Sequence, residues 1–66
     1  MPSSKRDMLK RKHTAIANAL VRCQGWTLEL HELFKEPHPD YAEGYNNILV
    51  MLEQTLTFIN KMKGFI

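Results

Sequence analysis

The chain has 66 residues, of which 44% are hydrophobic, with nine basic and seven acidic side chains. This hydrophobic content is ordinary for a globular protein and argues against disorder of the whole chain. The length fits a single domain, residues 1–66, near the lower limit for independent folding, because a domain this small buries only about 60% of its unfolded surface.

Three sequence features argue against a membrane or secreted protein. The longest uninterrupted apolar run, Ile48–Leu52, is closed by Glu53, whereas a membrane-spanning helix needs about 20 apolar residues. No apolar signal-peptide core follows the basic N-terminal residues. Cys23 is the single cysteine, so it cannot form an internal disulfide. We therefore expect a cytoplasmic protein that does not bind membranes.

A first helix is predicted over residues 5–35. Ser4 is followed three positions later by Asp7, a spacing typical of a helix N-terminus. Apolar residues then recur at intervals of three and four, as one face of an α-helix requires. This face consists of Leu9, His13, Ile16, Leu20, Cys23, Thr27, Leu30 and Phe34.

A turn is predicted over residues 36–40 because two prolines end the first helix. Pro37 and Pro39 each force the preceding residue out of the α-helical conformation. Such a short connection leaves the following helix antiparallel to the first.

A second helix is predicted over residues 41–63. Asp40 and Glu43 have the spacing of a capping box at its start. Gly64 is expected in the left-handed conformation just after its end. Its apolar face consists of Tyr41, Tyr45, Ile48, Leu52, Thr55, Ile59, Met62 and Ile66.

The sequence thus predicts an all-α fold, an antiparallel two-helix hairpin. No strand-like alternation competes with this interpretation. The two apolar faces align in a single register. The expected pairs are Phe34 with Tyr41, Leu30 with Tyr45, Cys23 with Leu52, Ile16 with Ile59, and Leu9 with Ile66.

Each helix carries more apolar side chains than a hairpin can bury. The surplus lies about a quarter-turn from the predicted contact and is expected to form a protein interface. Leaving three large aromatic side chains in water forgoes on the order of 10 kcal/mol. We therefore expect a homodimer that forms a four-helix bundle, with a different protein as the alternative partner. The predicted interface consists of Ala19, Trp26, Leu33, Met51, Phe58 and Phe65.

Basic residues are concentrated near the N-terminus, where residues 1–13 hold five basic side chains against one acidic side chain. Two interpretations stay open: a solvated helix end, or contacts to nucleic-acid phosphates. The overall net charge of only +2 favours the first. The candidate phosphate contacts are Lys5, Arg6, Lys10, Arg11 and Lys12.

No catalytic or metal-binding motif is recognisable. His31 and Glu32 begin a zinc-protease pattern, but Lys35 stands where its second histidine belongs. No glycine-rich phosphate loop is present, and we expect neither a cofactor nor a bound metal. The sequence favours a small non-enzymatic interaction module: a regulator, adaptor or inhibitor of a larger protein.

Overall fold

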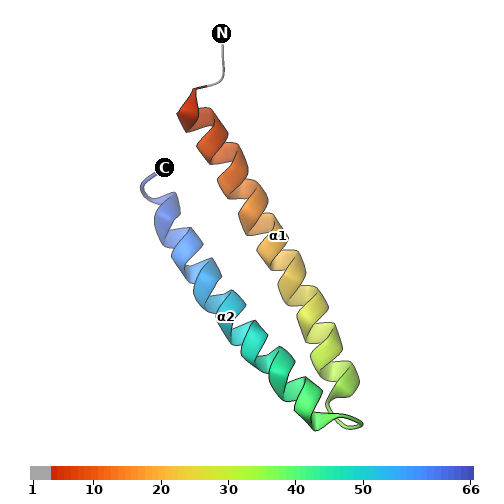
Figure 1. The fold of residues 1–66 in the computed structure, drawn as a ribbon. Coiled ribbons are helices and arrows are strands. Elements are labelled where there is room, and N and C mark those ends of the chain that lie inside the picture. The colour runs from red at the N-terminus through yellow and green to blue at the C-terminus, as the bar shows by residue number, and fades with distance from the viewer. Residues whose placement is uncertain (1–3) are drawn as a thin grey trace.

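The computed structural model describes residues 4–66, which form two helices joined by a tight turn (Figure 1). Helix α1 spans Lys5–Phe34 and helix α2 spans Pro39–Lys63. They lie side by side and antiparallel in a rod measuring 56 × 20 × 11 Å. No strand occurs among the described residues. The predicted all-α hairpin is therefore confirmed.

The start of α1 is capped as the sequence predicts. Ser4 has an extended backbone, and its hydroxyl oxygen accepts a hydrogen bond from the main-chain N–H of Asp7 over 3.1 Å. This bond satisfies one of the four N–H groups that a helix N-terminus leaves without a partner. Gly25 does not break α1, which continues to Phe34.

The start of α2 differs from the prediction, because His38 occupies the cap position and makes no side-chain capping bond. Pro39 is the first helical residue. Its ring fixes a helical φ angle, and the N–H that it lacks would have no partner at that position. Asp40 therefore lies inside the first turn. There its charge favours the positive end of the helix without capping it.

The end of α2 also differs from the prediction. Gly64 has φ −68° and ψ −20°, which is right-handed, so the expected left-handed glycine is wrong. The last turn instead tightens: the N–H of Gly64 donates to the oxygen of Lys61 over 3.1 Å, and that of Phe65 donates to Met62 over 2.9 Å. These shorter-range bonds satisfy terminal carbonyl groups without a left-handed residue.

The hairpin interface follows a heptad spacing in both helices, with steps of three and four residues. Only Ala42 and Thr27 are buried to below a tenth of their surface, and the other members are half-buried. From α1 the hairpin interface takes His13, Ala17, Leu20, Gln24, Thr27, His31 and Phe34; from α2 it takes Ala42, Tyr45, Leu49, Leu52, Leu56 and Ile59.

The predicted contact faces were wrong at several positions, which lie exposed beside the hairpin interface. These are Leu9, Ile16, Ile48 and Thr55. Tyr41 is also half exposed but keeps its predicted contact with Phe34. Each helix is rotated so that small side chains, Ala17 on α1 and Ala42 on α2, face the other helix. Small residues let the two backbones approach closely, whereas their neighbours Ile16 and Tyr41 would hold them apart.

The pairing at the turn agrees with the prediction. The rings of Phe34 and Tyr41 lie 5.5 Å apart and nearly perpendicular, at 79°. This edge-to-face arrangement is a favoured aromatic geometry. His38 stacks on Tyr41 with ring centres 4.7 Å apart, which joins the turn to the first turn of α2.

The register at the open end of the hairpin is shifted by about one turn from the prediction. The Nε2 of His13 donates to the main-chain oxygen of Ile59 over 3.1 Å. The Arg6 guanidinium donates to the oxygen of Ile66 over 2.8 Å. The predicted partner of Ile59 is Ile16, and that of Ile66 is Leu9. Each lies three positions further along α1 than the observed partner.

Candidate interaction site

A second heptad of mostly apolar residues lies beside the hairpin interface. Most of its members precede an interface position by one residue, and Leu9, Met62 and Phe65 continue the same spacing beyond the interface positions. We call this set the apolar face. From α1 it consists of Leu9, Lys12, Ile16, Ala19, Cys23, Trp26, Leu30 and Leu33; from α2 it consists of Tyr41, Gly44, Ile48, Met51, Thr55, Phe58 and Met62, with Phe65 just beyond the end of this helix.

Both halves of the apolar face lie on the same side of the hairpin. A residue that precedes a contact position is rotated by about 100° around the helix axis. In α2 both the chain direction and the direction of the contacting side chains are opposite to those in α1. With both directions reversed, the residues that precede the contact positions point to the same side of the hairpin in the two helices. The hairpin therefore has one broad apolar face formed by both helices.

The opposite side of the hairpin is mainly polar. It is formed by the residues that follow the contact positions, with Val21, Leu28 and Val50 as its exposed apolar members. Its polar members include Asn18, Glu32, Lys35, Glu43, Asn46, Glu53, Thr57 and Asn60. The hairpin as a whole is thus amphipathic, which is typical of an element that packs against a further layer.

All six residues of the predicted protein interface lie on the apolar face. Five of them are large and mostly exposed: Trp26 at 58%, Leu33 and Met51 at 64%, Phe58 at 65% and Phe65 at 86%. Ala19 is exposed among them. The hairpin therefore brings side chains from both helices, far apart in the sequence, onto one surface.

The prediction missed four large, exposed members of the apolar face, which it had assigned to the contact between the helices. They are Leu9, Ile16, Tyr41 and Ile48, and all are between 43% and 51% exposed. The signal that could have found them is the one-residue offset between two heptads on each helix.

Of the polar side chains on the apolar face, only that of Lys12 would be costly to bury against a partner. The Thr55 hydroxyl donates to the main-chain oxygen of Met51 over 2.8 Å, so its hydrogen is satisfied within its own helix. Cys23 is half-buried and behaves as a small apolar residue. Lys12 is the one charged member, and its long side chain can reach the edge of the face.

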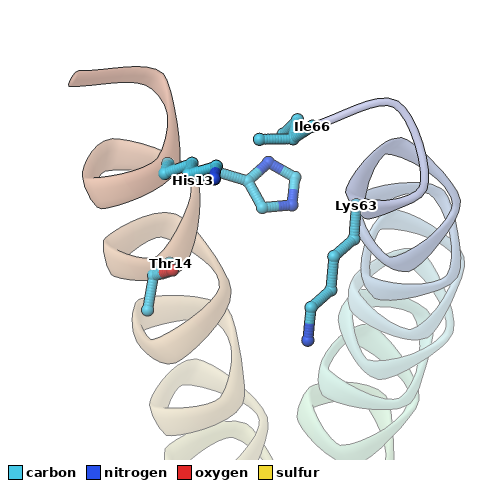
Figure 2. A pocket seen from close by; sticks show the side chains of 5 residues that line it. His13, Thr14, Lys63 and Ile66 are labelled. Atoms are coloured by element: carbon cyan, nitrogen blue, oxygen red, sulfur yellow. The ribbon is translucent and has the colours of Figure 1, made fainter. Parts of the chain in front are cut away.

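A second feature lies at the open end of the hairpin, where a hollow of about 280 Å³ separates the helices. It is lined by Lys10, His13, Thr14, Lys63 and Ile66. Figure 2 shows the His13 ring extending from α1, and the Lys63 side chain from α2, into the space between the helices. The hollow thus combines two lysines from different helices with an imidazole.

The candidate phosphate contacts lie at the same end of the rod as this hollow, although only Lys10 among them lines it. Together with Lys61 and Lys63 we call them the basic end. Lys5, Arg6, Lys10, Arg11 and Lys12 are all exposed on the first turns of α1. The fold returns Lys61 and Lys63 to the same end. Within residues 4–66 none of these side chains forms an ion pair.

The acidic side chains gather at the other end of the rod. We call this the acidic turn, and it holds Glu29, Glu32, Glu36, Asp40 and Glu43. Lys35 lies 3.8 Å from the Glu32 carboxylate, so part of this negative charge is balanced locally. The molecule therefore has a positive and a negative end.

Two of the polar side chains buried or partly buried in the hairpin interface differ in their hydrogen bonding. The buried Thr27 hydroxyl donates to the main-chain oxygen of Cys23 over 2.6 Å. The buried Nδ1 atom of His31 has no hydrogen-bond partner among the described residues. In that part of the chain no three histidine, cysteine or acidic residues are grouped to hold a metal ion.

Neither described helix has the length and apolar content needed to cross a membrane. Comparisons with protein-family models, with curated proteins and with solved structures found no match. The function is therefore inferred from the side chains and geometry of the hairpin itself.

Proposed function

We propose that this protein is a non-enzymatic interaction module that pairs with a second copy of itself through the apolar face, forming a four-helix bundle. The observation that carries the proposal is the presence of two adjacent heptads on each helix. A helix that packs against one neighbour, as in a simple coiled coil, needs one apolar heptad for that contact. Two adjacent heptads suit a helix with two neighbours, as in a four-helix bundle.

The small core of the single hairpin supports the same proposal. No large side chain among residues 4–66 is fully buried. At on the order of 100 Å² for each half-exposed large side chain, the apolar face offers several hundred Å². This area is comparable with the roughly 800 Å² per partner of a specific protein interface. A second copy supplies a matching face because it carries the same residues.

The shape of the hairpin favours binding over catalysis. Two helices in a single layer provide no enclosed space that would keep water from a reacting group. In a bundle the polar faces point outward, where Val21, Leu28 and Val50 form a small exposed apolar patch. A larger protein that the module regulates, bridges or inhibits could contact this patch. The single cysteine suits the reducing cytoplasm as the proposed compartment.

The concentration dependence of thermal unfolding tests the proposed self-association. A folded dimer is stabilised by mass action, so its unfolding midpoint rises with protein concentration. We expect this rise between about 1 and 100 μM. A cooperative unfolding transition whose midpoint is independent of concentration would contradict the proposal.

Nucleic-acid binding is a second candidate function, favoured by the return of Lys61 and Lys63 to the basic end. Its test is the affinity for mixed-sequence DNA and RNA at two salt concentrations. The matched variant changes Lys10, Arg11 and Lys12 together to glutamine. Micromolar binding that falls steeply with salt and is lost in the variant would establish this candidate. No binding at low salt would eliminate it.

A further inference from the structure

We infer that the second copy packs head-to-tail, so that each basic end lies against the acidic turn of its partner. This inference rests on the proposed self-association and adds the orientation of the two hairpins. It follows from the positions of the apolar side chains along both helices and from the distribution of charge.

The α1 half of the apolar face is self-complementary when α1 meets its copy in the antiparallel direction. In the register that brings the most apolar residues into contact, Leu9 packs against the partner's Leu33, and Ile16 packs against the partner's Trp26. Near the midpoint Ala19 meets the partner's Cys23, so two small side chains allow the helices to approach. All these positions belong to the second heptad, which the hairpin leaves exposed or half-buried.

The α2 half is self-complementary in the same arrangement. Its layers pair Tyr41 with the partner's Phe65, and Ile48 with the partner's Phe58. Gly44 meets the partner's Met62, where nothing in the hairpin lies within 4 Å of an added Cβ atom. Each pair, α1 with the partner's α1 and α2 with the partner's α2, has a midpoint about which its contacts are symmetric. In the register set by His13 and Ile59, these two midpoints lie at the same height along the rod to within about two residues, roughly 3 Å.

Apolar layers alone do not choose the orientation. If the two turns lay together, α1 would face the partner's α2, and Ile16 would meet the partner's Phe58. That arrangement also fills the apolar face. The difference between the two dimers is therefore electrostatic.

Charge favours the head-to-tail dimer. With the turns together, both basic ends would lie side by side within about one Debye length, 10 Å at moderate salt, and would repel each other. Head-to-tail packing instead places Lys12 beside the partner's Glu29 and Lys5 beside the partner's Glu36. Neither Lys5 nor Lys12 has an ion-pair partner within residues 4–66. In the head-to-tail dimer opposite charges meet at both ends of the apolar face.

Distances between paramagnetic labels distinguish the two orientations. Lys35 is exposed near the acidic turn and lies off the apolar face, so Lys35→Cys in a Cys23→Ala background carries one label per chain. Head-to-tail packing separates the two labels by about 40 Å along the rod, at 1.5 Å per residue. With the turns together, the labels would be separated only by the width of the bundle, roughly 20 Å.

A label near the middle of the rod provides the matched control. Asn18→Cys in the same background lies on the polar side and gives a separation below about 30 Å in either dimer. A long Lys35 distance with a short Asn18 distance supports the inference. Short distances at both positions overturn the orientation and leave the self-association intact. No dipolar coupling at either position overturns the proposed dimer as well.

A charge-reversal pair tests the contact itself. Lys12 and Glu29 are 17 positions apart on one helix, about 25 Å, so any coupling between them must act between chains. Lys12→Glu and Glu29→Lys should each raise the dimer dissociation constant by about two- to five-fold, and the double variant should restore it. Additive losses in the double variant would contradict the head-to-tail contact.

Discussion

The imidazole of His13 donates a hydrogen bond to the main-chain oxygen of Ile59, over 3.1 Å. Seven residues before His13, the Arg6 guanidinium donates to the main-chain oxygen of Ile66, seven residues after Ile59, over 2.8 Å. The two bonds therefore belong to one register. This register decides which residues the hairpin covers, and it leaves Trp26 and Phe58 exposed on the same side.

A charge on the apolar face should dissociate the protein. Phe58→Asp would place an unpaired carboxylate in the proposed interface, at a cost of several kcal/mol. Asn60→Asp introduces the same charge two residues along, on the polar side, and serves as the matched control. Size-exclusion chromatography with light scattering should show a monomer for Phe58→Asp and a dimer for Asn60→Asp. Equal masses for the two variants would argue against the apolar face as the interface.

The two helical glycines should respond differently to larger side chains. No atom lies within 4 Å of a Cβ added at Gly25 or Gly44. Gly25 is on the polar side, so Gly25→Ala should raise the free energy of unfolding by about 1 kcal/mol. Gly44 is on the apolar face, where Gly44→Leu should overpack the interface and cost about 1–3 kcal/mol. Denaturant unfolding measures both changes, and stabilisation by Gly44→Leu would indicate that no partner covers this position.

The reactivity of Cys23 should depend on protein concentration. The thiol is half-buried in the single hairpin and becomes enclosed when a second α1 packs over it. Its reaction with a thiol reagent should therefore slow as the protein concentration rises, because dissociation precedes labelling. Asn18→Cys with Cys23→Ala places a thiol on the polar side, and its rate should not change. A concentration-independent rate at Cys23 would mean that the apolar face stays open.

Loss of the α1 cap should loosen the first turn. Ser4→Ala removes the oxygen that accepts from the N–H of Asp7, at a cost of about 1 kcal/mol. Amide hydrogen exchange should accelerate in this turn, whereas Ser4→Asp, which keeps an acceptor, should preserve the slow exchange. Identical exchange in all three proteins would show that the cap contributes nothing to the stability of this turn.

The helices and their antiparallel arrangement could be predicted because local signals agree with each other. Ser4 marks the start of α1, and the prolines of the turn mark its end. The start of α2 was misplaced because Asp40 and Pro39 compete for the same boundary. The helix begins at Pro39 because the fixed φ angle of proline suits the first helical position.

The face of each helix that makes the contact could not be predicted from spacing alone. Ile16 and Ala17, like Ile48 and Leu49, are adjacent apolar residues, so each helix carries two heptads that satisfy the same three-and-four pattern. The choice between them depends on how closely the backbones approach, which is a property of the packed pair. The exposure of Trp26, Phe58 and Phe65 could be predicted, because two facing helices cannot cover three further large aromatic side chains.

Sedimentation equilibrium of the unmodified protein at tens of micromolar tests the central claim most directly. The apolar face should bring two chains together, and the measured mass should be near twice the 7.7 kDa of one chain. A mass of one chain, for a protein that is helical and unfolds cooperatively, would contradict the proposed four-helix bundle.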